Sequence, residues 1–230
     1  MQRLKFLALI AVVAMLLGAN QAAANQLVNG GFEADAVVDA APVGGASGWT
    51  TFGNANTASA NLDPVRSGIG SLQLAGAGGF TVPGGSQTFS ASPGEIWDFQ
   101  GFMLTENALP SDATFGLLKI VWSDGVNDLP PGTINIGQSG PPANPGVESL
   151  PFLNSASTLN AWQFTQAQGV APPGTTQVSF FALFVDQSGG TVYFDDLQAV
   201  RIPEPASIAL MGLAVFSGAA LVRRRRALSF

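Results

Sequence analysis

The sequence predicts an all-β protein built as a two-sheet antiparallel β-sandwich, with an apolar helical segment at each end of the chain. Three observations lead to this prediction. The 230 residues include 28 glycines and 15 prolines, which interrupt the chain too often for long helices. Segments rich in Phe, Val, Leu, Trp and Thr alternate with clusters of turn-forming residues. Hydrophobic residues make up 47% of the chain, enough for a buried core although only 10% of residues are charged.

Residues 1–24 have the pattern of a secretory signal peptide, which we expect to be helical. Arg3 and Lys5 precede an apolar stretch at residues 6–18. Ala22 and Ala24 are the small residues of the expected cleavage site, and cleavage would leave Asn25 at the new N-terminus. The alternative is that this segment stays in place as an uncleaved anchor.

Residues 25–201 are expected to form the sandwich. Between residues 176 and 185, apolar side chains alternate onto both faces, which predicts a central strand covered on both sides. Residues 129–150 are rich in Pro and Gly and lack a period, so a long loop is expected there. Strands are predicted at residues 71–74, 95–104, 114–122, 161–165, 176–185 and 191–200.

Residues 202–230 contain a second apolar stretch, at residues 206–222. As a helix with a rise of about 1.5 Å per residue it would be roughly 25 Å long, at the short limit for a transmembrane helix. It is followed at once by a cluster of four basic residues, which we expect to remain in the cytoplasm: Arg223, Arg224, Arg225 and Arg226. A permanent tail anchor is one interpretation of this segment.

A short motif of Pro203, Glu204 and Pro205 stands immediately before the apolar stretch. The order Pro-Glu-Pro, apolar span, arginine cluster resembles the PEP-CTERM sorting domain of exported proteins from Gram-negative bacteria that make exopolysaccharide. The resemblance implies transient anchoring in the inner membrane and cleavage near the motif by an exosortase-type protease. Release to the cell surface or the extracellular space would follow. One departure from the pattern is that residues 227–230 extend past the arginines.

The region between the two ends carries a second resemblance. It opens with Leu-Val-Asn-Gly-Gly-Phe-Glu at residues 27–33, continues with Gly-Trp at residues 48–49, and has Arg-Ser-Gly-Ile-Gly-Ser-Leu at residues 66–72. It closes with Val-Tyr-Phe-Asp-Asp-Leu at residues 192–197. In this order the motifs resemble the jelly-roll carbohydrate-binding modules of the galactose-binding-like superfamily. The resemblance spans roughly residues 26–200 and implies a jelly-roll sandwich.

A structural calcium ion commonly ties the opening segment of such modules to the closing strand. The matching ligands would be the carboxylates of Glu33 and of Asp195 or Asp196, with backbone oxygens near Gly31 and Ser67. Calcium prefers six to eight oxygen ligands, and a chain without His or Cys can supply them. Neighbouring residues on a strand point to opposite faces, so at most one of the two aspartates is expected to bind. The alternative is that these acids are solvated or form hydrogen bonds in turns.

A sugar site on this fold needs aromatic rings, on which sugar rings stack, beside hydrogen-bonding side chains. All four tryptophans lie in or beside apolar segments, so core packing is the favoured interpretation for each of them. No carbohydrate-binding residue is therefore identified from the sequence. The aromatic candidates are Trp49, Trp97, Trp122, Trp162 and Tyr193.

Composition excludes several classes of chemistry. The chain has no His and no Cys, which removes Ser-His-Asp triads, imidazole or thiolate zinc sites and cysteine nucleophiles. Residues 25–202 contain three cations and 14 acids, a net charge of −11 that repels nucleic acid. No motif for an organic cofactor and no catalytic acid pair is recognised, so we expect the protein not to be an enzyme.

Together these features predict a non-catalytic exported protein of the cell surface or extracellular matrix, associated with exopolysaccharide. The alternative is a carbohydrate-binding module with a defined sugar groove. A secreted carbohydrate-active enzyme is the weaker alternative.

Overall fold

The turn-forming residues divide the chain into many short strands. In the computed structural model, residues 24–186 and 188–203 are described, and within these ranges all regular elements are β-strands, β1 to β14. Residues Asn25–Arg201 form one compact unit. None of the described residues belongs to a helix long and apolar enough to cross a membrane. The expected all-β sandwich is confirmed; the expected signal peptide and transmembrane helix lie outside the described residues.

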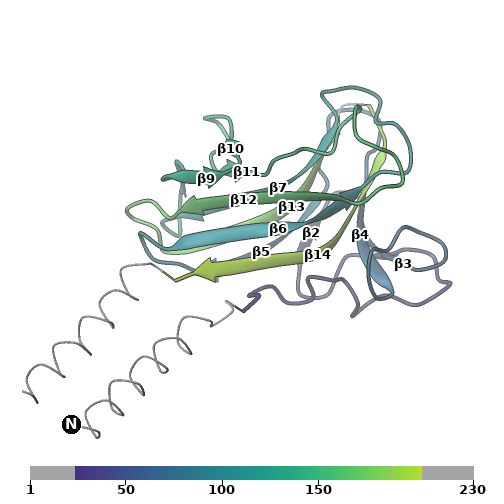
Figure 1. Ribbon diagram of the computed structural model, residues 1–230, viewed down its shortest axis with the longest axis horizontal. Helices are drawn as coiled ribbons and strands as arrows, with labels where there is room; N and C mark the ends of the chain where they lie inside the picture. Colours follow the sequence, from purple (N-terminus) through teal and green to yellow (C-terminus); the bar gives the residue numbers. More distant parts are fainter. Residues whose placement is uncertain (1–23, 187, 204–230) are drawn as a thin grey trace, which may run out of the picture. The chain divides into compact units, whose positions relative to one another are not determined.

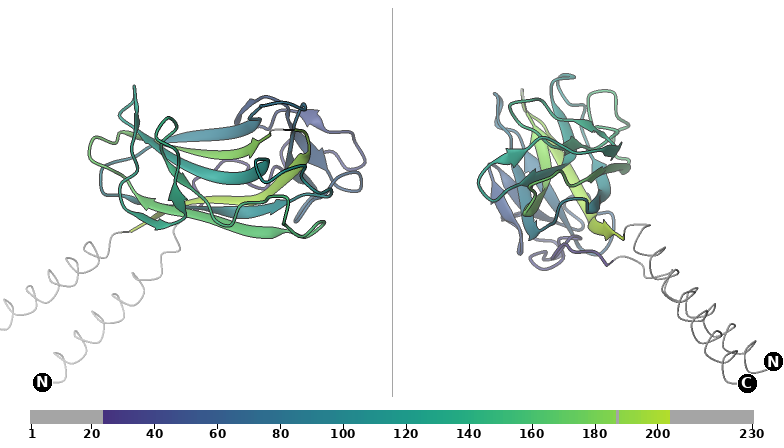
Figure 2. Two further views of the ribbon diagram at one scale, coloured as in Figure 1. Left: turned by 90° about the horizontal axis from the view of Figure 1, so that it is seen from above. Right: turned by 90° about the vertical axis from the view of Figure 1, so that its left-hand side faces the viewer.

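Two antiparallel sheets make up the sandwich and lie face to face (Figures 1 and 2). The first sheet has the order β1 (Val43–Gly44), β3 (Ala55–Ser59), β4 (Gly70–Ala75), β14 (Thr191–Ile202), β6 (Ile96–Leu104), β12 (Gln163–Val170) and β9 (Ile134–Ile136). The second has the order β10 (Gln138–Ser139), β11 (Val147–Glu148), β7 (Phe115–Ser123), β13 (Gln177–Val185), β5 (Gly84–Ser90) and β2 (Thr50–Phe52), with β8 (Asp128–Leu129) paired to β7.

The core lies between the sheets and is rich in aromatic rings. The ring of Phe180 on β13 lies 5.4 Å from that of Trp97 and 5.2 Å from that of Phe99, both on β6. Such contacts join the two sheets through large apolar surfaces. As expected, β13 is central, between β7 and β5, and its face toward the core is fully buried. Its other face is only partly covered, because Phe181 and Val185 are half-buried.

Two segments differ from the sequence-based expectation. Residues 129–150 contain short strands, including β11, which adds to the edge of β7. Pro83, Gly84 and Gly85 are a cluster of turn-forming residues, which predicts a turn. Gly84 and Gly85 instead begin β5, where Gly84 has no room for a side chain. A Cβ on Gly84 would lie 2.7 Å from the Phe52 ring and 2.8 Å from the Ala182 carbonyl oxygen. Tertiary packing therefore overrides the turn preference of glycine.

Candidate functional site

The first sheet presents an outward surface on β14, β6 and β12. Along β6 the inward residues Trp97 and Phe99 are at most 3% exposed, so the side chains between them point away from the core. The antiparallel register sets the outward residues of β6 directly beside those of β12. We call this set the outer face; its members are Asp98, Gln100, Phe102, Phe164, Gln166, Gln168 and Gln198.

Amide side chains cross-link the outer face. The Gln166 amide nitrogen Nε2 donates to both carboxylate oxygens of Asp98, at 2.9 Å each. Gln100 Nε2 donates to Gln198 Oε1 at 3.3 Å. Partial burial raises the pKa of Asp98, while hydrogen bonds from Gln166 and Gln168 lower it in part. These residues form a row of donors and acceptors across three strands, of the kind that can bind hydroxyl groups.

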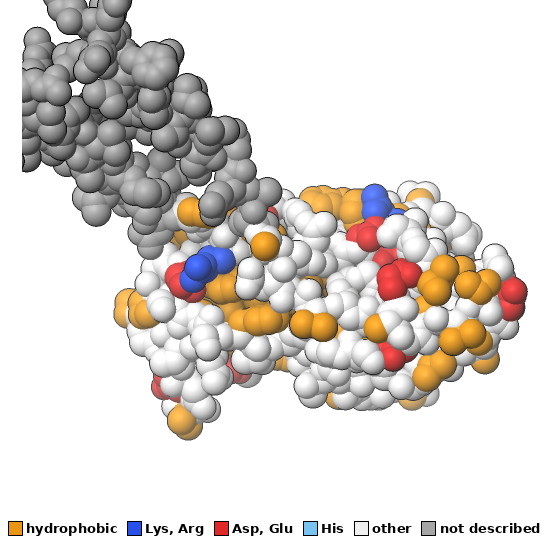
Figure 3. Space-filling model, turned by 90° about the horizontal axis from the view of Figure 1, so that it is seen from below, with side chains coloured by type: hydrophobic (Ala, Val, Ile, Leu, Met, Phe, Trp, Pro, Cys, Tyr) orange, Lys and Arg blue, Asp and Glu red, His pale blue; other side chains and the backbone are white. Residues whose placement is uncertain are grey.

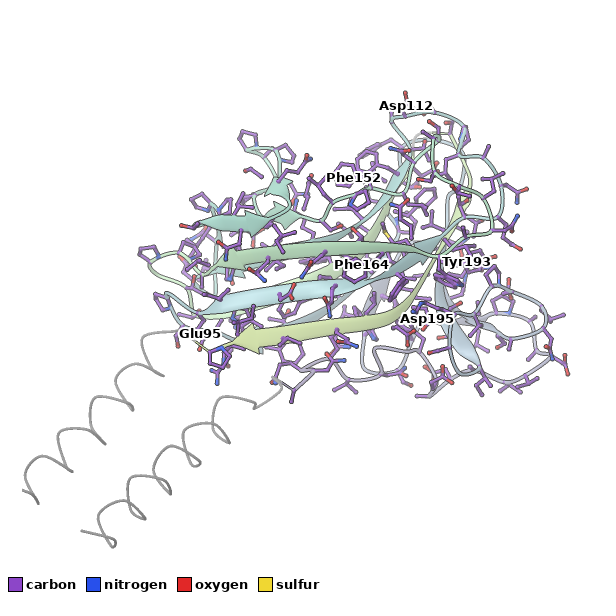
Figure 4. All side chains as sticks on the ribbon, in the orientation of Figure 1. Glu95, Asp112, Phe152, Phe164, Tyr193 and Asp195 are labelled. Atoms are coloured by element: carbon purple, nitrogen blue, oxygen red, sulfur yellow. The ribbon has the colours of Figure 1, made fainter. Side chains whose placement is uncertain are left out.

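An aromatic pair lies beside this polar row. The Phe164 side chain, labelled on the open face of the sheet in Figure 4, is on a residue that is 44% exposed. Its ring is 5.4 Å from that of Phe102, edge to face at 64°. Phe102 also contacts the Arg66 guanidinium, whose Cζ lies 3.5 Å from the ring centroid. Phe164 is therefore a fixed apolar surface open to a ligand.

Tyr193 lies at the β4 end of the same surface (Figure 4). Its hydroxyl is 3.2 Å from Asp63 Oδ1 and 3.2 Å from Glu106 Oε2, and it accepts a hydrogen bond from Gln73 Nε2 at 3.2 Å. Burial raises the pKa of Tyr193, and the two carboxylates raise it further. The ring packs in a small outward-facing cluster that consists of Ala58, Leu104, Tyr193 and the partly buried Trp162.

The expected calcium ligands lie near one another, around the loop that precedes β4. The Glu33 carboxylate accepts hydrogen bonds from the backbone N–H groups of Ile69, at 2.8 Å, and Gly70, at 3.2 Å. Gly31 lies in the turn before Glu33, and a Cβ added to it would be 3.9 Å from Glu33 Oε1. The opening segment is thus fastened to the loop by a carboxylate that binds backbone N–H groups.

Asp195 and Asp196 fasten the same loop to β14. Asp195 Oδ2 accepts from the N–H groups of Arg66, at 2.8 Å, and Ser67, at 3.1 Å, and its Oδ1 accepts from the Asp196 N–H at 2.6 Å. The residue is fully buried, and burial raises the pKa of Asp195 to about 6. Asp196, with φ of 52°, points instead to the surface, where it pairs with the Arg66 guanidinium and accepts from Ser67 Oγ at 2.7 Å.

Calcium binding can be tested against these contacts. A cation needs oxygen atoms directed toward it, whereas the oxygens of Glu33 and Asp195 are directed at N–H groups. Among the described residues, no group of three or more acidic side chains is arranged to hold a metal ion. As they lie, these residues do not form a cage for calcium, and the calcium site stays a prediction.

Three of the four tryptophans pack in the core, as expected from the sequence. Trp49, Trp97 and Trp122 belong to the main core and are 8%, 3% and 0% exposed. Trp162 is only partly buried and packs on the outward-facing side of the first sheet. Phe164 is not predicted as a site residue from the sequence. The alternation of residues along β12 could have found it: Phe164 lies on the same strand face as Gln166 and Gln168, and an apolar residue on such a polar face is exposed.

Comparison with known proteins identifies the class of signal at the C-terminus and the class of fold. Residues 201–226 match the PEP-CTERM protein-sorting motif, and the range contains the predicted Pro203, Glu204, Pro205 and arginine cluster. The motif indicates export with a C-terminal sorting signal. Of these residues only Pro203 is among those that the structure describes. No curated protein sequence matches the chain.

Two solved structures illustrate the fold. The carbohydrate-binding module TmCBM61, solved with β-1,4-galactotriose, is 16% identical, with a TM-score of 0.50 over 78% of this chain and 99% of that one. An arabinose-bound α-L-arabinofuranosidase, MgGH51, is 15% identical, with a TM-score of 0.52 over 77% of this chain but only 26% of that one. At such low identity the likeness shows the fold alone, the jelly-roll sandwich of carbohydrate-binding modules.

Proposed function

We propose that the chain is a non-catalytic exported protein of the cell surface or extracellular matrix whose sandwich binds exopolysaccharide through the outer face. An exosortase-type protease of a Gram-negative bacterium would process the tail, after transient anchoring in the inner membrane. The matched sorting motif supports the processing and the destination. Exopolysaccharide is proposed as the ligand because this sorting signal resembles that of exported proteins from bacteria that make exopolysaccharide.

The observation that carries the binding proposal is the exposed Phe164 ring beside a cross-linked row of amides and a carboxylate. Sugars have apolar C–H faces and polar edges, so they are bound by a ring with hydrogen-bonding groups around it. That TmCBM61 binds a β-1,4-linked galactose trisaccharide on the same type of sandwich agrees with this proposal.

Phe164→Ala tests the proposal in affinity electrophoresis of the purified exported protein through gels containing β-1,4-galactan, xylan or hydroxyethyl cellulose. We expect at least one polymer to slow the protein, and the substitution to weaken that binding by about tenfold, equivalent to about 1.4 kcal/mol of ring stacking. The matched control is Phe52→Ala, which removes a ring that is 37% exposed on β2 of the second sheet. The proposal would be contradicted if both variants lost polymer binding equally, or if none of the polymers slowed the wild-type protein.

A secreted carbohydrate-active enzyme, the weaker alternative, would need a pair of catalytic acids. Glycoside hydrolysis uses two carboxylic acids on either side of the scissile bond. On this surface Asp98 is held by Gln166, and Asp63 and Glu106 share the hydroxyl of Tyr193. We therefore expect no reducing ends to be released from any polymer that the protein binds. Release that is lost in Glu106→Gln would favour an enzyme instead.

A further inference from the structure

The cations of the described domain are all occupied by acidic partners. Arg66 pairs with Asp196, Lys119 with Glu148 and Arg201 with Glu95. In the view of Figure 3, each group of basic side chains (blue) accordingly lies beside an acidic one (red). Since residues 25–202 have only these three cations against 14 acids, 11 carboxylates are left without a side-chain cation to neutralise them.

Part of this excess borders the surface on which Phe164 lies. Asp98 is at one end of the outward stretch of β6, and Glu106 and Asp63 meet Tyr193 beyond the other end. From Asp98 to Leu104 the strand covers about 20 Å at 3.3 Å per residue, which is room for several sugar rings. Arg66 is stacked on Phe102 and paired with Asp196, so its guanidinium does not offset these acids.

We propose that the outer face prefers polysaccharides that carry free amino groups over their N-acetylated counterparts, and that it rejects polyanions such as uronic acid polymers. This proposal rests on the proposed function, because it concerns the ligand of the same surface. A polymer that lies along β6 across Phe164 brings ammonium groups toward carboxylates at both ends of its path. Opposite charges there attract, and carboxylate groups on the ligand would meet the same acids with repulsion.

The test compares two ligands that differ only in the amino group. The probes are a chitosan hexamer, which is β-1,4-linked glucosamine, and a chitin hexamer, its N-acetylated form, with an alginate oligomer as the polyanion. Binding to the purified exported protein is measured by calorimetry at about pH 6, where aliphatic amines of this kind are largely protonated. We expect the chitosan hexamer to bind at least about tenfold more tightly in about 20 mM salt, and most of the difference to vanish in about 0.5 M salt.

Single-charge variants assign the preference to this surface. Asp98→Asn removes an acid of the outer face and Glu106→Gln removes one that borders it, whereas Asp128→Asn removes one exposed acid from β8, on the second sheet. All three change the net charge equally. We expect each of the first two to reduce the chitosan preference by about threefold, and Asp128→Asn to leave it unchanged within experimental error.

The outcomes separate the two proposals. If the chitin hexamer binds as tightly as the chitosan hexamer, and Phe164→Ala weakens both, the amine preference is wrong while polysaccharide binding stands. If Asp128→Asn reduces the preference as much as Glu106→Gln, the attraction belongs to the net charge and the amine selectivity of this surface is overturned. If the protein binds no polymer at any salt concentration, the proposed function fails, and the amine preference fails with it.

Discussion

At the residue scale, Asp195 is the carboxylate on which the loop before β4 depends most. It is fully buried and accepts hydrogen bonds from three backbone N–H groups. Asp195→Ala leaves these donors buried without an acceptor, so at pH 7 we expect the free energy of unfolding to fall by about 1–3 kcal/mol. Asp196→Asn, the adjacent control, removes a partly exposed ion pair, keeps a residue type that tolerates the φ of 52°, and should lower it by only about 0–1 kcal/mol. Urea denaturation of the two variants measures these changes. An equal fall in the free energy of unfolding would show that Asp195 holds the loop no more strongly than Asp196 does.

The same residue predicts a pH dependence. Because burial raises the pKa of Asp195 from 3.8 to about 6, the folded protein holds a proton in this range more readily than the unfolded chain does. The stability that Asp195 contributes is therefore largest below about pH 3.8, is lost as the pH rises through about 6, and is level only above about pH 7. The difference in free energy of unfolding between wild type and Asp195→Ala should follow this course in urea titrations. A difference that grows with rising pH would show that the N–H groups outweigh the burial.

Residues of the candidate site differ in how far the sequence predicts them. The sequence brings Glu33, Asp195 and Ser67 to one place through the order of their motifs, and the structure places them around one loop. The sequence does not show what these acids bind. Their partners are backbone N–H groups of a distant loop, and every residue type except proline supplies such a group. The exposure of Phe164 is not predicted from the sequence for a related reason. Whether an aromatic residue on a strand is buried depends on which face of the strand the second sheet covers.

At the element scale, Lys119 fastens the edge of the second sheet. Its side chain is only 3% exposed, and its Nζ donates to the Asn144 carbonyl oxygen at 2.8 Å and contacts Glu148 Oε1 at 3.4 Å. Burial lowers the pKa of Lys119, and Glu148 opposes that shift. These contacts hold β10 and β11 against β7, in a region where the sequence predicts a loop.

Lys119→Met keeps the buried aliphatic chain and removes the charge. We expect amide hydrogen exchange in residues 138–148 to accelerate by about tenfold, because local opening no longer breaks an ion pair, while exchange in β13 stays unchanged. Arg201→Met, which breaks a more exposed pair with Glu95, is the control and should leave both regions unaffected. Faster exchange throughout the domain would mean that Lys119 supports the whole fold and not this edge alone.

Elements are predictable here to the extent that local signals and packing agree. β6, β7, β13 and β14 are long, apolar and bounded by turns, and the sequence predicts each of them. Predicted residues 161–165 lie partly before β12, which spans Gln163–Val170, since its Gln, Ala and Gly residues give little β-signal of their own. Pairing with β6 along its full length makes this stretch a strand.

At the scale of the whole molecule, the charges are divided between the ends and the domain. Six of the nine cations lie at Arg3, Lys5 and the arginine cluster, whereas residues 25–202 have a net charge of −11. An acidic domain stays soluble outside the cell and resists binding to nucleic acid. Arginines immediately after an apolar span oppose its passage through the membrane. The division of charge thus suits a chain whose middle is exported while its last residues are held back.

Replacing Arg223, Arg224, Arg225 and Arg226 with alanine tests that division in the full chain, in a host that has an exosortase-type protease. Without the positive charges the tail is not retained, so Pro203 and its neighbours are not presented at the outer side of the membrane; we expect the processed form to decrease by about tenfold. Immunoblots of cell and medium fractions measure it. Arg201→Ala, which removes a single charge at the first residue of the matched range, two positions before Pro203, should be processed normally. If the arginine-free chain is still processed as efficiently as wild type, the cluster is not part of the sorting signal, and the Pro-Glu-Pro motif with its apolar span would have to be sufficient.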